Sequence, residues 1–180
     1  YGTSYSAEQF FLEVFYPLFF DSNKYLYWVQ NSSFVQMKKG QKVETLTSDE
    51  RKEKLDNFIE KISSGVADAS IAIGYPASEE KEYATTSGQV SNLLFPISKE
   101  DVYYSWFGSA LGVGVQGGIS IFFYNVDILL DVYEGWKLYR KAIDSIDKLS
   151  GNKIMTWNGQ WLAHRYSRFF NEMDNMSGFN

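Results

Sequence analysis

The sequence predicts an α+β fold that is mostly helical with a small mixed sheet. Apolar residues recur at helical spacing in five segments, and short stretches rich in aromatic and β-branched residues lie between them. The longest uncharged run, Val102 to Val126, has a glycine-dense centre at 112–118, which indicates a helix, a glycine-rich turn and then a central strand. We expect a single domain, 1–180, built around this run, and we leave open that the chain is a fragment of a larger subunit.

The N-terminal elements begin with a helix. Ser6 and Gln9 have the spacing of a capping box, so the first helix is predicted to start at Ser6. Pro17 is expected to kink or end this helix, because proline cannot continue the backbone hydrogen bonds. Two short strands are expected next, at 25–30 and 34–37.

The second helix has clearer limits. Ser48 is expected to cap it, and Gly65 is a typical residue to end it. A short strand at 69–73 should follow. The expected buried residues of this helix are Leu55, Phe58, Ile59 and Ile62.

The C-terminal half is dominated by helices. Ser98 with Asp101 is expected to cap the third, whose core residues should be Val102, Trp106, Ala110 and Leu111. The apolar segment 119–124 predicts the central strand, and Asn125 should cap the next helix, which Gly151 ends. Glycine in a helix interior lowers stability by about 1 kcal/mol, so Gly135 predicts close approach by another element. The stripe of that helix is Leu129, Val132, Trp136, Tyr139, Ile143 and Ile146, and a last helix is expected over 159–173.

Composition and charge exclude several classes of function. The chain has no cysteine, so it can form neither a disulfide framework nor a thiolate zinc site. Glycines and polar residues dilute the run at 102–126, so we expect no membrane span, and we predict a cytoplasmic location. The net charge of −5 argues against a nucleic-acid binder that relies on overall charge. However, the segment 135–170 has seven basic residues against two acidic ones.

Two motifs point weakly to chemistry. Gly112 to Gly117 satisfies G-x-G-x-x-G, but a dinucleotide site needs a strand before the glycines and a helix after them. A tight turn is the better interpretation. Asp68, Glu80 and Lys81 resemble the carboxylates and lysine of a metal-dependent nuclease, although a solvated charge cluster fits their charged surroundings better. The lone histidine, His164, has no evident nucleophile to serve, so we predict no catalytic residue, metal or cofactor.

The strongest pattern combines basic, aromatic and amide side chains near the C-terminus. Arginine and lysine neutralise phosphates, amides read base edges, and aromatic rings stack on exposed bases. The alternative is a helix with an ordinary basic face and buried aromatics, which spacing alone favours. The candidate nucleic-acid-binding residues here are Lys137, Arg140, Lys141, Lys153, Asn158, Gln160, Arg165 and Arg168, with Trp157 and Tyr166 between them.

Several segments within 65–166 together resemble the large subunit of type I CRISPR surveillance (Cascade) complexes, in the branch of subtypes I-A and I-B. These segments are Thr86-Ser87-Gly88-Gln89-Val90-Ser91-Asn92, 105–118, Glu134-Gly135-Trp136-Lys137, and 151–161. The resemblance implies a non-enzymatic subunit at the foot of the guide-RNA complex. Its partners would be the other subunits of that complex, target DNA and a nuclease-helicase.

Two features depart from this family. Many members carry paired C-x-x-C zinc motifs and are considerably longer, whereas this chain has 180 residues and no cysteine. Either a zinc segment lies outside this chain or the branch is different. By analogy of mechanism, a glycine loop with a protruding glutamine could read the DNA minor groove, so Gly114, Gln116 and Gly117 are further candidates.

The sequence leaves three hypotheses of function. The leading one is a non-enzymatic subunit of a CRISPR effector that contacts the target-adjacent duplex or the displaced strand. The second is a metal-dependent nuclease that uses Asp68, Glu80 and Lys81. The third is an aromatic-rich protein-interaction module, since aromatic residues make up 18 % of the chain.

Overall fold

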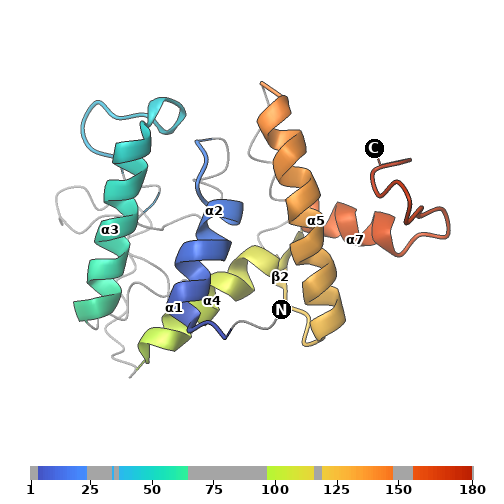
Figure 1. Cartoon of the computed structure of the whole chain (residues 1–180), viewed down its shortest axis with the longest axis horizontal. Coiled ribbons are helices and arrows are strands. Elements are labelled where there is room, and N and C mark those ends of the chain that lie inside the picture. The colour runs from blue at the N-terminus through green and yellow to red at the C-terminus, as the bar shows by residue number, and fades with distance from the viewer. Residues whose placement is uncertain are drawn as a thin grey trace. The chain divides into compact units, whose positions relative to one another are not determined.

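The structure is a computed structural model that describes residues 4–23, 34, 37–64, 97–115, 119–147 and 156–179. The chain divides into two compact units, Tyr1–Ala110 (the N-terminal unit) and Leu111–Asn180 (the C-terminal unit). Each is mostly helical within its described residues, as the sequence predicts (Figure 1).

The N-terminal unit begins with α1 (Ala7–Phe10), a π-helical turn η1 (Phe11–Phe15) and α2 (Tyr16–Phe19). The capping box is confirmed, because Ser6 and Gln9 exchange two side chain to backbone hydrogen bonds of 3.1 Å. Pro17 does not end the winding where it occurs, since residues 7–19 are continuously helical, and the helix ends two residues later at Phe19. The wider π turn precedes Pro17, and the N–H of Tyr16 donates to the carbonyl of Phe11, five residues back.

A 3₁₀ turn, η3 (Val43–Thr45), leads into α3 (Ser48–Ser64). The residue that caps α3 is Thr47 rather than the predicted Ser48. The Thr47 hydroxyl accepts the Glu50 N–H at 3.2 Å, and the Glu50 carboxylate accepts the Thr47 N–H at 2.8 Å. This second hydrogen bond, with a smaller contribution from Gln41, lowers the pKa of Glu50. Thr47 and Glu50 have the spacing of a capping box, whereas Ser48 has Arg51 three residues later, so the predicted cap was wrong by one residue.

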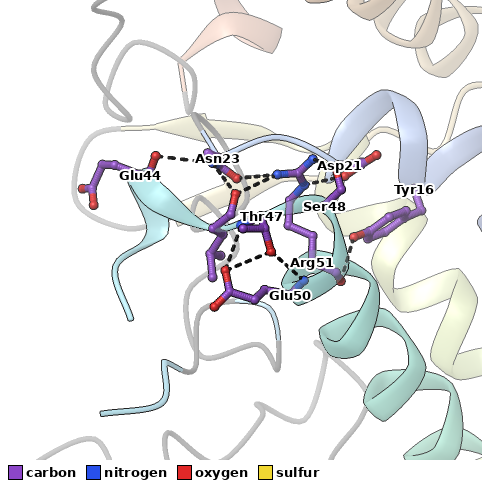
Figure 2. Close-up of polar contacts among 9 residues, drawn as sticks. Tyr16, Asp21, Asn23, Glu44, Thr47, Ser48, Glu50 and Arg51 are labelled. Atoms are coloured by element: carbon purple, nitrogen blue, oxygen red, sulfur yellow. Dashed lines mark hydrogen bonds and ion pairs between the residues drawn. The ribbon is translucent and has the colours of Figure 1, made fainter. Parts of the chain in front are cut away.

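The beginning of α3 is tied to the end of α2 by Arg51 (Figure 2). Its guanidinium donates to Asp21 at 2.8 Å, to the side chain of Asn23 at 2.9 Å and to the Leu46 carbonyl at 3.1 Å. The Tyr16 hydroxyl donates to the Arg51 carbonyl at 3.5 Å, and burial raises the pKa of that hydroxyl. One planar side chain therefore joins three segments of the chain.

The last helix of this unit is α4 (Lys99–Leu111), capped by Ser98 and Asp101 as predicted. Its buried side chains include the expected Val102, Trp106 and Ala110. Tyr103 is also buried, whereas Leu111 is only half-buried. The core of the unit is aromatic, with rings in contact from the N-terminal helices, α3 and α4: Phe11, Phe15, Phe19, Phe20, Phe34, Phe58, Tyr103 and Trp106.

The C-terminal unit begins with two short strands on either side of residues 116–118, which lie outside the described residues. Strand β1 (Val113–Val115) pairs antiparallel with β2 (Ile119–Ile121), with Val113 opposite Ile121. The predicted mixed sheet is not present among the described residues, which hold this one antiparallel pair. The predicted strand at 119–124 ends at Ile121, and the next residues are largely exposed, so it is not a central buried strand.

The described residues of this unit also form two helices, α5 (Val126–Ser145) and α7 (Trp157–Arg165). Asn125 caps α5 as predicted, by accepting from two backbone N–H groups. Both helices are shorter than predicted, since α5 ends before Gly151 and α7 ends before 173. The residues that follow α7 form turns, consistent with their many Ser, Asn, Asp and Gly residues.

The expected stripe of α5 is confirmed for Val132, Trp136, Tyr139 and Ile143, which are buried. Ile146 is exposed because the helix has already ended. Within the described ranges, no helix has the length and hydropathy required to cross a membrane. The strands expected at 25–30 and 69–73, residues 35–36 of the strand expected at 34–37, and Gly65 lie outside the described residues.

Candidate nucleic-acid interface

Helix α7 lies directly on α5, and the contact is built around a glycine. The indole of Trp161 covers Gly135, and a side chain on Gly135 would come closer than 3.0 Å to that ring. The Trp161 Nε1 also donates to the backbone carbonyl of Asp131, one turn earlier on α5, at 2.8 Å. The close approach predicted from Gly135 is therefore confirmed.

Asn158, in the first turn of α7, also holds this helix in position. This side chain has no exposed surface. It accepts the Trp136 indole N–H at 2.7 Å and donates to the Gly112 carbonyl at 2.7 Å. Asn158 thus bridges α5, α7 and the residue that precedes β1. Its amide is used inside the unit and is not available to a base edge at the surface.

The packing of α7 on α5 forms an open cleft of about 600 Å³. Lys137 and Lys141, one turn apart on α5, line it together with Arg165 from α7. Trp161 and Phe170 supply aromatic surface to the same cleft. Three of the predicted nucleic-acid-binding cations therefore converge on one concave surface, which we call the basic cleft.

Acidic residues share the basic cleft with these cations. Lys137 pairs with Glu134 at 2.6 Å, and Arg165 pairs with Asp131 at 3.3 Å and with the exposed Glu172 at 4.0 Å. The two pairs differ in depth, because Asp131 and Arg165 are mostly covered whereas Glu134 is half-exposed.

Asp131 is held more firmly than Glu134. The Tyr166 hydroxyl donates to its carboxylate at 2.7 Å, and this hydrogen bond raises the pKa of Tyr166. The pair of Asp131 and Arg165 therefore helps to hold α7 on α5, whereas the pair of Glu134 and Lys137 can separate at little cost.

Other predicted residues lie away from the basic cleft. Arg140 pairs with Asp144 one turn later on α5, at 3.2 Å. The guanidinium of Arg168 lies 4.6 Å from the centre of the exposed Phe169 ring. Gln160 is exposed and lines a second cleft of about 410 Å³ with His164. His164 lies 2.9 Å from the Asn175 carbonyl and among aromatic rings.

Several predicted residues cannot be placed. Lys153, Gln116 and Gly117 lie outside the described residues, whereas Gly114 is in β1. Asp68, Glu80 and Lys81, the nuclease candidates, also lie outside them. In the part of the chain that the structure describes, no group of three or more acidic or histidine side chains is arranged to hold a metal ion.

The sequence-based list omitted the acidic side of the cleft. Glu134 lies three residues before Lys137, a spacing that brings side chains together on a helix, so this pair could have been found from the sequence. The pairing of Asp131 with Arg165 spans 34 residues, and no local pattern predicts it.

Comparisons with protein-family models, with curated proteins and with solved structures found no match to this chain. The family resemblance therefore stays a prediction.

Proposed function

We propose that this chain is a non-enzymatic, nucleic-acid-contacting subunit of a CRISPR RNA-guided surveillance complex, and that the basic cleft contacts the phosphate backbone. The proposal that the chain contacts nucleic acid rests on the convergence of Lys137, Lys141 and Arg165 on one open cleft. The CRISPR setting rests on the sequence resemblance.

The chemistry of the cleft suits a phosphodiester. Lysine ammonium groups bind phosphate as mobile point charges, and exposed ion pairs contribute only about 0–1 kcal/mol. A phosphate can therefore replace Glu134 at Lys137 with a loss of at most about 1 kcal/mol of folding stability. Lys141 is exposed and adds a second cation one turn away.

The acidic residues of the cleft limit what it can do alone. Their charges offset the cations at long range, so we expect weak, salt-sensitive and sequence-independent binding. Such a contact suits a subunit whose complex selects its target by guide pairing, because the protein then needs only to hold the backbone. Target DNA, the neighbouring subunits and a nuclease-helicase are the partners in this proposal.

The test is binding of fluorescent duplex and single-stranded DNA across a salt series. The Lys137→Gln/Lys141→Gln variant removes two cleft cations, whereas Lys39→Gln/Lys52→Gln removes two exposed cations from the N-terminal unit and is matched in net charge. Arg165 is left intact because its pair with Asp131 supports the fold. For the duplex, the slope of log affinity against log salt should become shallower by about two in the cleft variant alone.

Equal slopes in the two variants would place any binding outside the basic cleft. Absence of binding by the wild-type chain at low salt would overturn autonomous contact with nucleic acid. The same variants reconstituted with guide RNA and partner subunits would then test contact within the assembly.

A further inference from the structure

A second surface of the C-terminal unit is apolar and exposed. It lies between the end of β2 and the first turns of α5, within a segment of ten residues, 121–130. Phe122 is 64 % exposed, Val126 70 % and Leu130 54 %. We call it the apolar surface, and its residues are Ile121, Phe122, Tyr124, Val126 and Leu130.

The local geometry groups these side chains in pairs. Phe122 and Tyr124 are two residues apart in the segment between β2 and α5, and both are exposed whereas Phe123 between them is half-buried. Val126 and Leu130 are one turn apart on the same side of α5. Exposed apolar side chains gathered in this way mark interaction sites more often than scattered ones do.

The charges near the apolar surface are acidic. Between Asp101 and Lys137 the charged residues are Asp127, Asp131 and Glu134. Asp127 lies within the apolar surface, is exposed and has no ion pair with another described residue. An apolar centre beside an exposed carboxylate is complementary to a partner that carries both apolar and basic side chains.

Charge also disfavours two other occupants. A second copy would bring together two chains that each carry a net charge of −5, with Asp127 on both sides of the contact. A membrane surface attracts helices with lysine and arginine beside their apolar face, and the nearest residues here are acidic.

We propose that the apolar surface docks an amphipathic, lysine- or arginine-bearing segment of another protein. Phe122, Val126 and Leu130 are the apolar anchors, and Asp127 pairs with a basic side chain of the partner. This contact is separate from the basic cleft and does not depend on nucleic-acid binding.

The test uses a fluorescent synthetic peptide of about 18 residues, an amphipathic helix of leucine and lysine. Two further peptides separate the contributions, one with glutamate in place of lysine and one with the same leucines and lysines distributed around the helix. Anisotropy would be measured with the full chain, with Phe122→Ser/Leu130→Ser, and with Tyr104→Ser/Met173→Ser as a control that removes two exposed apolar residues elsewhere.

The proposal expects tight binding of the amphipathic basic peptide by the wild-type and control chains, and binding at least about tenfold weaker by Phe122→Ser/Leu130→Ser. Asp127→Asn should weaken binding a few-fold and reduce its salt dependence. The acidic and redistributed peptides should bind poorly.

Equal binding of the basic and acidic peptides, or no effect of Phe122→Ser/Leu130→Ser, would overturn the proposal. Sedimentation velocity that finds a wild-type dimer lost in this variant would identify a second copy as the occupant instead. Flotation with phosphatidylcholine and phosphatidylserine vesicles that depends on Phe122 would identify a membrane. A loss of stability well beyond about 0.5 kcal/mol in Phe122→Ser would show that the surface is covered within the chain.

Discussion

Trp161 lies over Gly135 so closely that the glycine has room for no side chain. The indole N–H donates to the Asp131 carbonyl on the same helix. Glycine in the middle of α5 lowers helix stability by about 1 kcal/mol, and this lets a large ring reach the backbone and bury its surface. The packing of α7 on α5 therefore depends on the absence of a side chain.

We expect Gly135→Ala to destabilise the chain by about 1–2 kcal/mol in urea unfolding. Alanine is the better helix former, but its methyl group must displace the Trp161 ring, and overpacking costs about 1–3 kcal/mol. The control is the same substitution in a Trp161→Ala background, where there is room for the methyl group. There Gly135→Ala should stabilise by up to about 1 kcal/mol, and the same sign in both backgrounds would contradict the steric explanation.

Asn158→Ala should lower the free energy of unfolding by about 2–4 kcal/mol. It leaves the Trp136 indole N–H and the Gly112 carbonyl without their hydrogen-bond partner inside the unit, and each buried unsatisfied group costs about 1–3 kcal/mol. Asn175→Ala is the matched control, because Asn175 is exposed and should change stability by less than about 0.5 kcal/mol. Similar values for the two variants would mean that Asn158 is not a bridge.

The contrast between Gly135 and Asn158 shows what a sequence can reveal. Glycine is unfavourable inside a helix, and Gly135 lies in a strongly periodic one, so its close contact could be predicted before the partner was known. Nothing local signals the burial of Asn158, because asparagine is common near a helix start and is usually exposed. Its burial depends on Trp136 and Gly112, which are distant in the sequence.

Arg51→Ala should destabilise the chain by about 2 kcal/mol, because it removes hydrogen bonds to a carboxylate, an amide and a backbone carbonyl at a mostly covered position. Arg51→Lys should recover only part of this loss, since lysine keeps the charge but not the planar fork. Lys52→Ala, at the next and exposed position of α3, is the control for thermal melts. Full recovery by lysine would mean that charge alone matters.

Stability should fall in alkaline solution between about pH 10 and pH 12. Burial raises the pKa of both Tyr103 and Tyr139 from 10.0 to about 12. The unfolded chain therefore loses these protons first, so the stabilisation is fully present below pH 10 and is lost as pH rises towards 12, by about 1.4 kcal/mol per pH unit for each tyrosine.

Tyr139→Phe should accordingly move the midpoint of alkaline unfolding to higher pH, followed by circular dichroism. Tyr124→Phe, at a fully exposed position, is the control and should leave the midpoint unchanged. Equal midpoints for wild type and Tyr139→Phe would show that the buried hydroxyl does not govern the transition.

Local signals predicted the helix starts, since the caps at Ser6, Ser98 and Asn125 depend only on nearby residues. The predicted helix ends at Gly151 and 173 were wrong, and so was the central strand at 119–124, because helix ends and burial depend on what packs against each segment. The basic residues were found as a pattern, but the acidic partner of Arg165 comes from another helix. The sequence could therefore predict the basic residues of the candidate site but not their partners from other helices.

The π turn at Phe11–Phe15 has a consequence for the register of the first helical segment. Such a turn is an α-helix that has absorbed one additional residue, so each of its residues rotates by less than the 100° of an α-helix. In an α-helix, side chains four residues apart differ in direction by about 40° around the axis, and the π turn reduces this difference. Phe11, Phe15 and Phe19 thus all remain within the aromatic core. Deletion of one residue here would restore regular winding and leave the direction of the residues after it nearly unchanged, because the π turn has already absorbed the additional residue. The π turn therefore accommodates one additional residue without turning Phe19 away from the aromatic core.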